Sequence, residues 1–213
     1  MTALNQTNGP GRNSTPLAAG FADPVHDAQR GFRTIMNAMA RPGTLQDIDT
    51  GGLKPPAPLS ATAAAIALTL FDYDTPVWLD APFARSEAVK TFLRFHTGAP
   101  IVSEPVEAAF ALIADPAHLS VLGKFHQGTL EYPDRSATVI LTGQTLTNEG
   151  PVRLSGPGIE TETAFSAAPV SPAFWDQVKA NNAQFPRGVD LIFAGSAEIA
   201  ALPRSTTVTL REA

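Results

Sequence analysis

Residues 60–80, SATAAAIALTLFDYDTPVWLD, place a helix, a turn and a strand in immediate succession. Ser60 is suited to cap the helix, and the alanine-rich run after it has no charged residue, which predicts a largely buried helix. The segment FDYDTP has the chemistry of a turn, and TPVWLD predicts a strand. A buried helix that leads directly into a strand indicates layered α/β structure.

A first helix is predicted upstream, with Asp23 as its N-cap, Pro24 in its first turn and Pro42-Gly43 as its stop signal. Apolar residues recur at i, i+3, i+4 and i+7 and predict its buried face: Phe32, Ile35, Met36 and Met39. The opposite face is polar and carries Asp27, Arg30, Arg33, Asn37 and Arg41. Asp27 and Arg30 are three residues apart and are expected to pair.

Further helices are predicted downstream. Ser86 caps residues 87–95, whose buried face holds Val89, Phe92 and Leu93, and Gly98 ends this helix. Asp115-Pro116 is expected to start a helix over residues 117–125, closed by Gly128, and Ser171-Pro172 to start the last one, over 173–181. Strands are predicted from apolar runs at 101–105, 108–114, 137–143, 151–156, 159–165, 189–195 and 206–212.

About four helices interleaved with six or seven strands indicate an α/β protein with a mixed sheet, built as a single domain over residues 21–213. The strands at 137–143, 151–156 and 159–165 are expected to form a meander, and the strand at 206–212 to pair at a sheet edge. Residues 1–20 are polar and rich in Gly and Pro, which predicts a flexible N-terminal arm.

Composition excludes several function classes. The 213 residues include 15 Lys and Arg against 20 Asp and Glu, a net charge of −5, which argues against nucleic acid as the main partner. The absence of cysteine excludes disulfides, cysteine-ligated zinc, iron–sulfur clusters and a thiol nucleophile, and fits a cytoplasmic protein. No stretch of 18 apolar residues occurs, so no transmembrane helix is expected.

The common catalytic motifs are missing from the sequence, and Gly156-Pro157-Gly158 is interpreted as a hairpin turn rather than a dinucleotide-binding loop. The four histidines have no i, i+4 spacing, so no metal site is predicted. His96 stands at a helix end, where capping is expected more often than catalysis. None of the four lysines stands in a setting that favours a Schiff base, and no cofactor is expected.

Arginine supplies eleven of the fifteen basic residues. Several arginines stand beside Gly, Pro or Asp where elements end: Arg41, Arg135, Arg187 and Arg204. The rigid guanidinium fork suits a phosphate or a carboxylate, and binding sites gather at loop ends. Ordinary turn arginines, or arginines in ion pairs within or between subunits, remain the alternative.

The sequence resembles the H-subunit family (PhnH) of the carbon–phosphorus lyase system, from about residue 21 to the C-terminus. The resemblance begins with PVHDAQRGFR (24–33) and MARPG (39–43). It continues with DYDTPVWL (72–79), RFHTGAP (94–100), YPDRSAT (132–138), LSGPGI (154–159), FPRGVDL (185–191) and LPRST (202–206). The order of these motifs is specific, and the first twenty residues fall outside the match.

The resemblance implies a subunit of the cytoplasmic complex that uses phosphonates as a phosphorus source, with the G, I and J subunits as partners. The G, H, I and L proteins together replace the adenine of ATP with a phosphonate, which yields a ribose 1-phosphonate 5-triphosphate. The resemblance also implies a homodimer and a fold similar to the large domain of pyridoxal-phosphate-dependent transferases, without the cofactor's lysine. It supplies no catalytic residues.

Two hypotheses for the molecular role follow. In the first, the chain is a non-catalytic or accessory subunit, and Arg94, Arg135 and Arg187 are interface or structural residues. In the second, the chain binds a phosphonate or triphosphate directly at a dimer-interface cleft. The ligand-binding residues would then be Arg94, His96, Arg135, Arg187 and Arg204. The polar face of the first helix, with Asp27, Arg30 and Arg33, is expected to be an interface or a solvated surface.

Overall fold

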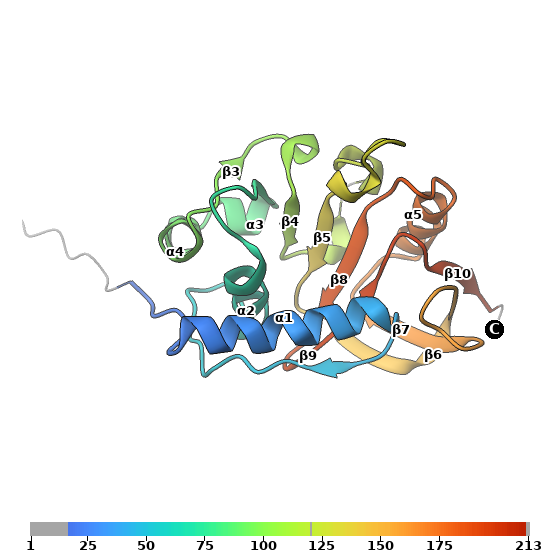
Figure 1. The fold of residues 1–213 in the computed structure, drawn as a ribbon, viewed down its shortest axis with the longest axis horizontal. Helices are drawn as coiled ribbons and strands as arrows, with labels where there is room; N and C mark the ends of the chain where they lie inside the picture. The colour runs from blue at the N-terminus through green and yellow to red at the C-terminus, as the bar shows by residue number, and fades with distance from the viewer. Residues whose placement is uncertain (1–16, 120, 212–213) are drawn as a thin grey trace, which may run out of the picture.

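The computed structural model describes residues 17–119 and 121–211. Its centre is a seven-stranded sheet in the order β1-β9-β8-β5-β4-β2-β3 (Figure 1). β3, β2, β4, β5 and β8 run parallel, whereas β9 is antiparallel to both its neighbours, so the predicted mixed sheet is confirmed. The strands are β1 (Gln46–Asp47), β2 (Val77–Leu79), β3 (Ile101–Val102), β4 (Phe110–Ile113), β5 (Thr138–Leu141), β8 (Asp190–Ala194) and β9 (Glu198–Leu202).

A second, antiparallel sheet has the order β10-β6-β7. It contains β6 (Thr145–Ser155), β7 (Thr163–Ala168) and β10 (Thr207–Leu210). The predicted terminal strand at the sheet edge is therefore confirmed, and Gly156-Pro157-Gly158 lies in the hairpin that joins β6 to β7. The predicted meander is only partly correct. β6 and β7 pair antiparallel, as predicted, but β5 is buried between two parallel neighbours in the larger sheet. β9 has no counterpart among the predicted strands.

The helices begin where the sequence places their caps. α1 (Pro24–Ala40), α2 (Ala61–Leu70) and α4 (Glu87–Thr97) follow Asp23, Ser60 and Ser86, whose side chains each accept a backbone N–H of the first turn. Gly98 ends α4 in the left-handed conformation at φ 72°. The remaining α-helices are α3 (Ala81–Ala84) and α5 (Pro172–Asn182).

The helix expected over residues 117–125 is wrong. This segment forms two single 3₁₀ turns, η2 (Pro116–His118) and η3 (Leu122–Lys124). Gln177 on α5 accepts the backbone N–H of Leu122 at 2.8 Å, and Gln127 donates to the carbonyl of Leu122 at 3.0 Å. These side chains take backbone groups that a continuous helix would use itself. Two further 3₁₀ turns are η1 (Pro105–Glu107) and η4 (Pro133–Arg135).

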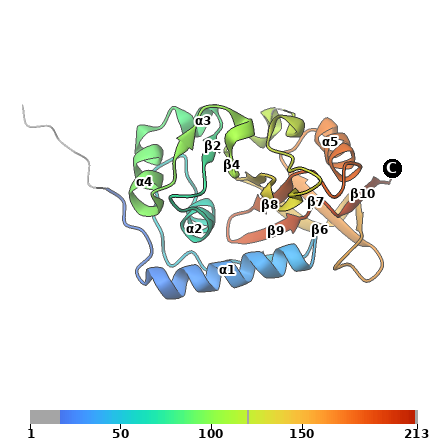
Figure 2. The same cartoon turned by 45° about the horizontal axis from the view of Figure 1, so that its top comes forward.

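The seven-stranded sheet separates two hydrophobic cores. Alternate residues along its central strands point to opposite faces: Leu112, Ile140 and Ile192 pack with α1, α2 and α4, whereas Ile113, Leu141 and Phe193 pack with α5 and the smaller sheet. Figures 1 and 2 show α4 at one end of the molecule and α5 with β10 at the other. Each large apolar side chain that is fully buried contributes about 1.5–3 kcal/mol.

The predicted buried face of α1 is only partly correct. Ile35 is buried, but Phe32 and Met36 are 49% and 54% exposed, and the buried positions also include Asp27 and Gly31. Gly31 explains this orientation, because a Cβ there would lie 2.5 Å from Oγ1 of Thr69 on α2. The close approach of the two helices turns Gly31 inward and leaves Phe32 and Met36 outside.

The predicted N-terminal arm falls mostly outside the described residues, which begin at Leu17. The described end of that arm contacts α4, where Nε2 of His96 lies 2.9 Å from the carbonyl oxygen of Ala18. Among the described residues, no helix has the length and apolar character needed to cross a membrane.

Candidate functional site

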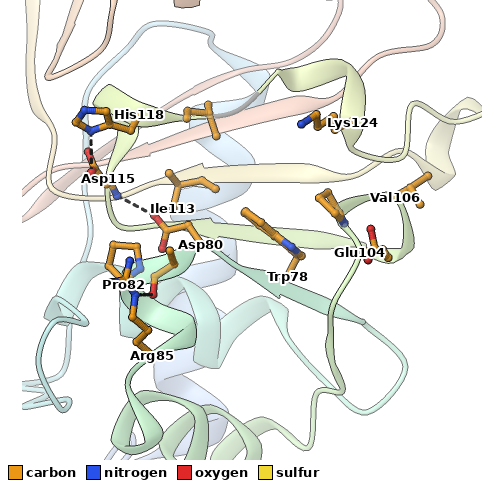
Figure 3. A pocket seen from close by; sticks show the side chains of 13 residues that line it. Trp78, Asp80, Pro82, Arg85, Glu104, Val106, Ile113, Asp115, His118 and Lys124 are labelled. Atoms are coloured by element: carbon orange, nitrogen blue, oxygen red, sulfur yellow. Dashed lines mark hydrogen bonds and ion pairs between the residues drawn. The ribbon is translucent and has the colours of Figure 1, made fainter.

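The site with the best geometry for a ligand is a pocket of 750 Å³ at the carboxyl ends of β2 and β4 (Figure 3). The chain leaves β2 toward β3 on one side and leaves β4 toward β5 on the other. In open α/β sheets, ligands bind at such a reversal of strand order, outside the carboxyl ends of the strands. Asp80 and Asp115 follow these two strands and both line the pocket.

Asp80 joins the ends of the two strands. Its carboxylate caps α3 by accepting the N–H of Phe83 at 3.4 Å, and its other oxygen accepts the N–H groups of Ala114 and Asp115 at 2.8 and 2.9 Å. Burial raises the pKa of Asp80, and the nearby charge of Asp115 adds to this, while the three N–H bonds act in the opposite direction. Asp80 therefore fixes the pocket floor.

Three basic side chains from different segments border the pocket. Arg85 follows α3 and donates through Nε to the carbonyl of Ala81 at 3.0 Å, which leaves its terminal amino groups outside that bond. His118 on η2 has Nδ1 at 2.9 Å from Oδ2 of Asp115, so its Nε2 points away from the pair. Lys124 ends η3 on another side of the pocket (Figure 3).

The apolar part of the pocket centres on Trp78. Its indole Nε1 donates to the carbonyl of Ser103 at 3.1 Å, and its ring meets Phe125 edge-on at a centroid distance of 5.5 Å. These contacts hold the indole in one orientation between Val106 and the strand ends. Glu104 adds a carboxylate beside this wall. The pocket thus combines a fixed aromatic surface with charged groups of both signs.

The structure brings three of the predicted ligand residues to one region. The guanidinium of Arg204 donates to Oγ of Ser136 and to the carbonyl of Gly188, which are the chain neighbours of Arg135 and Arg187. Arg135 lies over the ring of Tyr132 at 4.3 Å, and both Arg135 and Arg187 are exposed. This region lies before β5 and β8, at the amino ends of the parallel strands, and so on the opposite edge from the pocket.

Arg94 and His96 belong to a different part of the molecule. α4 packs against α2 and α3, whereas the carbonyl of Arg204 accepts a bond from Asn182 at the end of α5. Within the described chain, no hydrogen bond or ion pair joins Arg94 or His96 to the other three residues, and none of the five lines the pocket. His96 instead contacts Ala18 and the rings of Phe92 and Phe95.

The polar face of α1 is partly internal. Asp27 is buried and pairs with Arg30, as the sequence predicts, and Arg30 also lies 3.5 Å from Asp49. Arg33 is exposed and is the one member of this predicted interface set without an ion pair among the described residues. No group of three or more metal-ligating side chains forms in the described part of the chain.

Comparison with known proteins decides the family. A family model described as "Bacterial phosphonate metabolism protein (PhnH)" matches residues 19–209. The chain belongs to the PhnH family. The resemblance inferred from the ordered sequence motifs is therefore confirmed over nearly all the described residues.

Two named relatives extend the comparison. One, from Rhizobium meliloti (strain 1021), is named alpha-D-ribose 1-methylphosphonate 5-triphosphate synthase subunit PhnH; it is 40% identical over 186 residues, covering 87% of this chain and 92% of the relative. The other, from Stutzerimonas stutzeri, is named putative C-P lyase subunit protein HtxG; it is 33% identical and covers 87% of each chain.

Sequence reasoning missed the pocket in this PhnH family member, although a signal was present. Asp80 is the last residue of one predicted strand, TPVWLD, and Asp115 directly follows another, the apolar run at 108–114. Carboxyl ends of parallel strands meet at one edge, so these residues could have been paired had the strands been assigned as parallel. The arginines drew attention instead because they stand in prominent Gly- and Pro-containing turns.

Proposed function

We propose that this chain is an accessory subunit of a carbon–phosphorus lyase complex. In that complex it acts with the G, I and L proteins to transfer a phosphonate onto the ribose C1 of ATP, with release of adenine. The observation that carries the proposal is the 40% identity to a synthase subunit across 92% of that relative's length. The second relative, whose name is that of a carbon–phosphorus lyase subunit, supports the same assignment. A cytoplasmic location is part of the proposal.

The contacts of Arg204 favour the accessory role over direct anion binding at the predicted arginines. Its guanidinium already bonds to Ser136 and Gly188 and lies 3.6 Å from Asp190, so a ligand would have to compete with these partners. Arg135 and Arg187 are exposed and suit a partner surface, because arginine and aromatic residues are enriched at interfaces. Anion binding by Arg135 and Arg187 remains the second candidate function.

A groove beside α1 supplies a surface for assembly. It has a volume of 500 Å³ and is lined by Phe32 and Met36 of α1 together with Leu70 and Phe110. Exposed apolar surface of this kind marks contacts with other chains. In the proposal it is covered by a second copy in the free protein or by another subunit in the complex, with the G, I and J subunits as the partners.

A similarity of the fold to a known class of enzyme domain is also part of the proposal. The parallel centre of the sheet, with antiparallel β9 and the short β1 on one side, supports a similarity to the large domain of pyridoxal-phosphate-dependent transferases.

Co-purification tests the proposed function. The chain is co-expressed with tagged G, I and J subunits, and the complex is assayed with the L protein for adenine release from ATP and methylphosphonate. The expected result is a stable complex whose adenine release requires this chain. Adenine release of equal rate without the chain, or failure of the chain to co-purify, would overturn the proposal. Arg135→Ala and Arg187→Ala then separate the two roles, because loss of assembly supports a partner surface and loss of activity in an intact complex supports anion binding.

A further inference from the structure

The two internal methionines of the chain line the same groove. The sequence has no cysteine and three methionines, of which Met1 lies outside the described residues. Met36 and Met39 are three residues apart on α1, and both line the groove of 500 Å³ beside that helix. The sulfur atoms of the described residues are therefore gathered on the surface to which the proposed function assigns assembly.

The two methionines differ in how well solvent reaches them. Met36 is 54% exposed, whereas Met39 is partly buried and packs against the core beneath α1. The close approach of Gly31 to Thr69 on α2 sets this difference, because it turns α1 so that Met36 faces outward. Met36 is therefore the methionine that a dissolved oxidant reaches first, and Met39 is an internal reference on the same helix.

The surroundings of Met36 suit a thioether and not a sulfoxide. Phe32 on α1, Leu70 at the end of α2 and Phe110 at the start of β4 line the groove with it. Among the described residues that line the groove, only Thr138 carries a polar side chain. A thioether is apolar and adapts its shape to a partner, whereas the oxygen of a sulfoxide loses its hydrogen bonds to water when another chain covers it.

We propose that Met36 is a redox-sensitive switch for assembly, because its oxidation by hydrogen peroxide disfavours the chain that covers the groove. The sulfur attacks one oxygen of the peroxide, the O–O bond breaks, and the other oxygen takes the remaining proton and leaves as water. The sulfur is thus oxidised by two electrons and the peroxide is reduced. Methionine sulfoxide reductases return the product to the thioether, so the change is reversible. The switch rests on the proposed function, since it requires the groove to be an assembly surface.

Hydrogen peroxide treatment of the isolated full-length chain tests the chemical step. Mass spectrometry with fragmentation between residues 36 and 39 measures the two sulfoxides separately. Met36 is expected to oxidise several-fold faster than Met39 in the free chain, and several-fold more slowly in the assembled complex than in the free chain. A heat capacity scan of the treated chain should still show cooperative unfolding, because an oxygen on an exposed side chain leaves the core intact.

Co-purification with tagged G, I and J subunits tests the effect on assembly. Only this chain is treated, and the peroxide is removed before the subunits are mixed. The oxidised chain is expected to bind about tenfold more weakly than the untreated chain, and reductase treatment should restore binding. Met36→Leu and Met39→Leu are the matched variants, each compared with its own untreated sample. Peroxide should leave the assembly of Met36→Leu unchanged, whereas Met39→Leu, which keeps Met36, should be as sensitive as the wild type.

Four results would overturn the switch: equal oxidation of Met36 and Met39, normal assembly of the oxidised chain, equal sensitivity of Met36→Leu and the wild type, or a loss that the reductase does not reverse. If the oxidised and untreated chains assemble equally well, the proposed function stands and the switch is wrong. If the untreated chain joins no complex, the proposed function is wrong. The switch is then decided by self-association of the free chain, which oxidation should shift toward monomer in light scattering.

Discussion

Arg204 and Asp190 are joined at two points: the backbone N–H of Arg204 donates to Oδ1 of Asp190 at 2.8 Å, and its guanidinium lies 3.6 Å from Oδ2. Both side chains are more than four-fifths buried. Through Ser136 and Gly188, the same guanidinium also contacts the segments before β5 and β8. Arg204 therefore ties together three stretches of chain that are distant in sequence.

Replacement of Arg204 is expected to destabilise the fold. Arg204→Met removes the charge beside Asp190 and leaves Ser136 and the Gly188 carbonyl without this donor, which should lower the free energy of unfolding by about 2–4 kcal/mol. Urea denaturation measures this change. Arg187→Met, at an exposed arginine of the same region, is the control and should stay within about 0.5 kcal/mol of the wild type. If the urea midpoint of Arg204→Met were unchanged, the structural role of Arg204 would be wrong, and Arg204 would again be a candidate for ligand binding.

The pH dependence of stability is expected to report on Asp80. Burial raises its pKa in the native state above the unfolded value of 3.8, so the folded protein takes up a proton first as the pH falls. Relative to Asp80→Asn, the wild type should therefore gain stability as the pH falls from neutral through the raised pKa, and the difference should level off below 3.8. The measurement is the unfolding free energy of the wild type and of Asp80→Asn across this pH range. If the wild type instead lost stability relative to Asp80→Asn as the pH fell, burial would not be what raises the pKa of Asp80.

Sequence motifs such as helix caps correctly predicted the parts of the fold that depend only on residues close together in the sequence. Asp23, Ser60 and Ser86 cap their helices because capping needs only the first turn. The segment after Pro116 was mispredicted because distant Gln177 takes the N–H of Leu122. The orientation of α1 likewise depends on the close approach of Gly31 to Thr69 on α2. The spacing of apolar residues within α1 carries no information about that contact.

The candidate site was less accessible to sequence reasoning than the fold. Asp80 and Asp115 are 35 residues apart, and they meet because β2 and β4 pair in parallel, with Leu79 opposite Leu112. Arg135, Arg187 and Arg204 were chosen by residue type and turn context, and the structure shows that Arg204 bonds within the protein. The resemblance to the family was enough to predict a subunit of a larger complex. The pocket could be found only from the parallel pairing of β2 and β4, which the sequence does not show directly.

Gly158 is expected to be intolerant of a side chain. It adopts φ +83°, and a Cβ there would lie 2.2 Å from the carbonyl oxygen of Ala40 at the end of α1. Gly158→Ala should combine backbone strain with a backbone clash and lower the free energy of unfolding by about 2–4 kcal/mol. Thermal unfolding checks this value.

Gly143 provides the matched control for that substitution. It also has a positive φ, +67°, but nothing lies within 4 Å of a Cβ built on it. Gly143→Ala should therefore show only the conformational cost, about 1 kcal/mol. If Gly158→Ala and Gly143→Ala lowered the free energy of unfolding equally, the contact between the β6–β7 hairpin and α1 would contribute nothing to stability.

The apolar groove beside α1 yields the last prediction. Phe32 and Met36 are about half exposed on its rim, so a charge at either position should cost the folded monomer little and should disfavour any chain that covers the groove. Met36→Glu is expected to shift the free protein toward monomer in light scattering and to reduce its recovery with the G, I and J subunits. Val25→Glu, also on α1 and 62% exposed but outside the groove, should leave both unchanged. Loss of association in both variants would indicate a general effect of negative charge on α1, and normal association of Met36→Glu would place the assembly surface elsewhere.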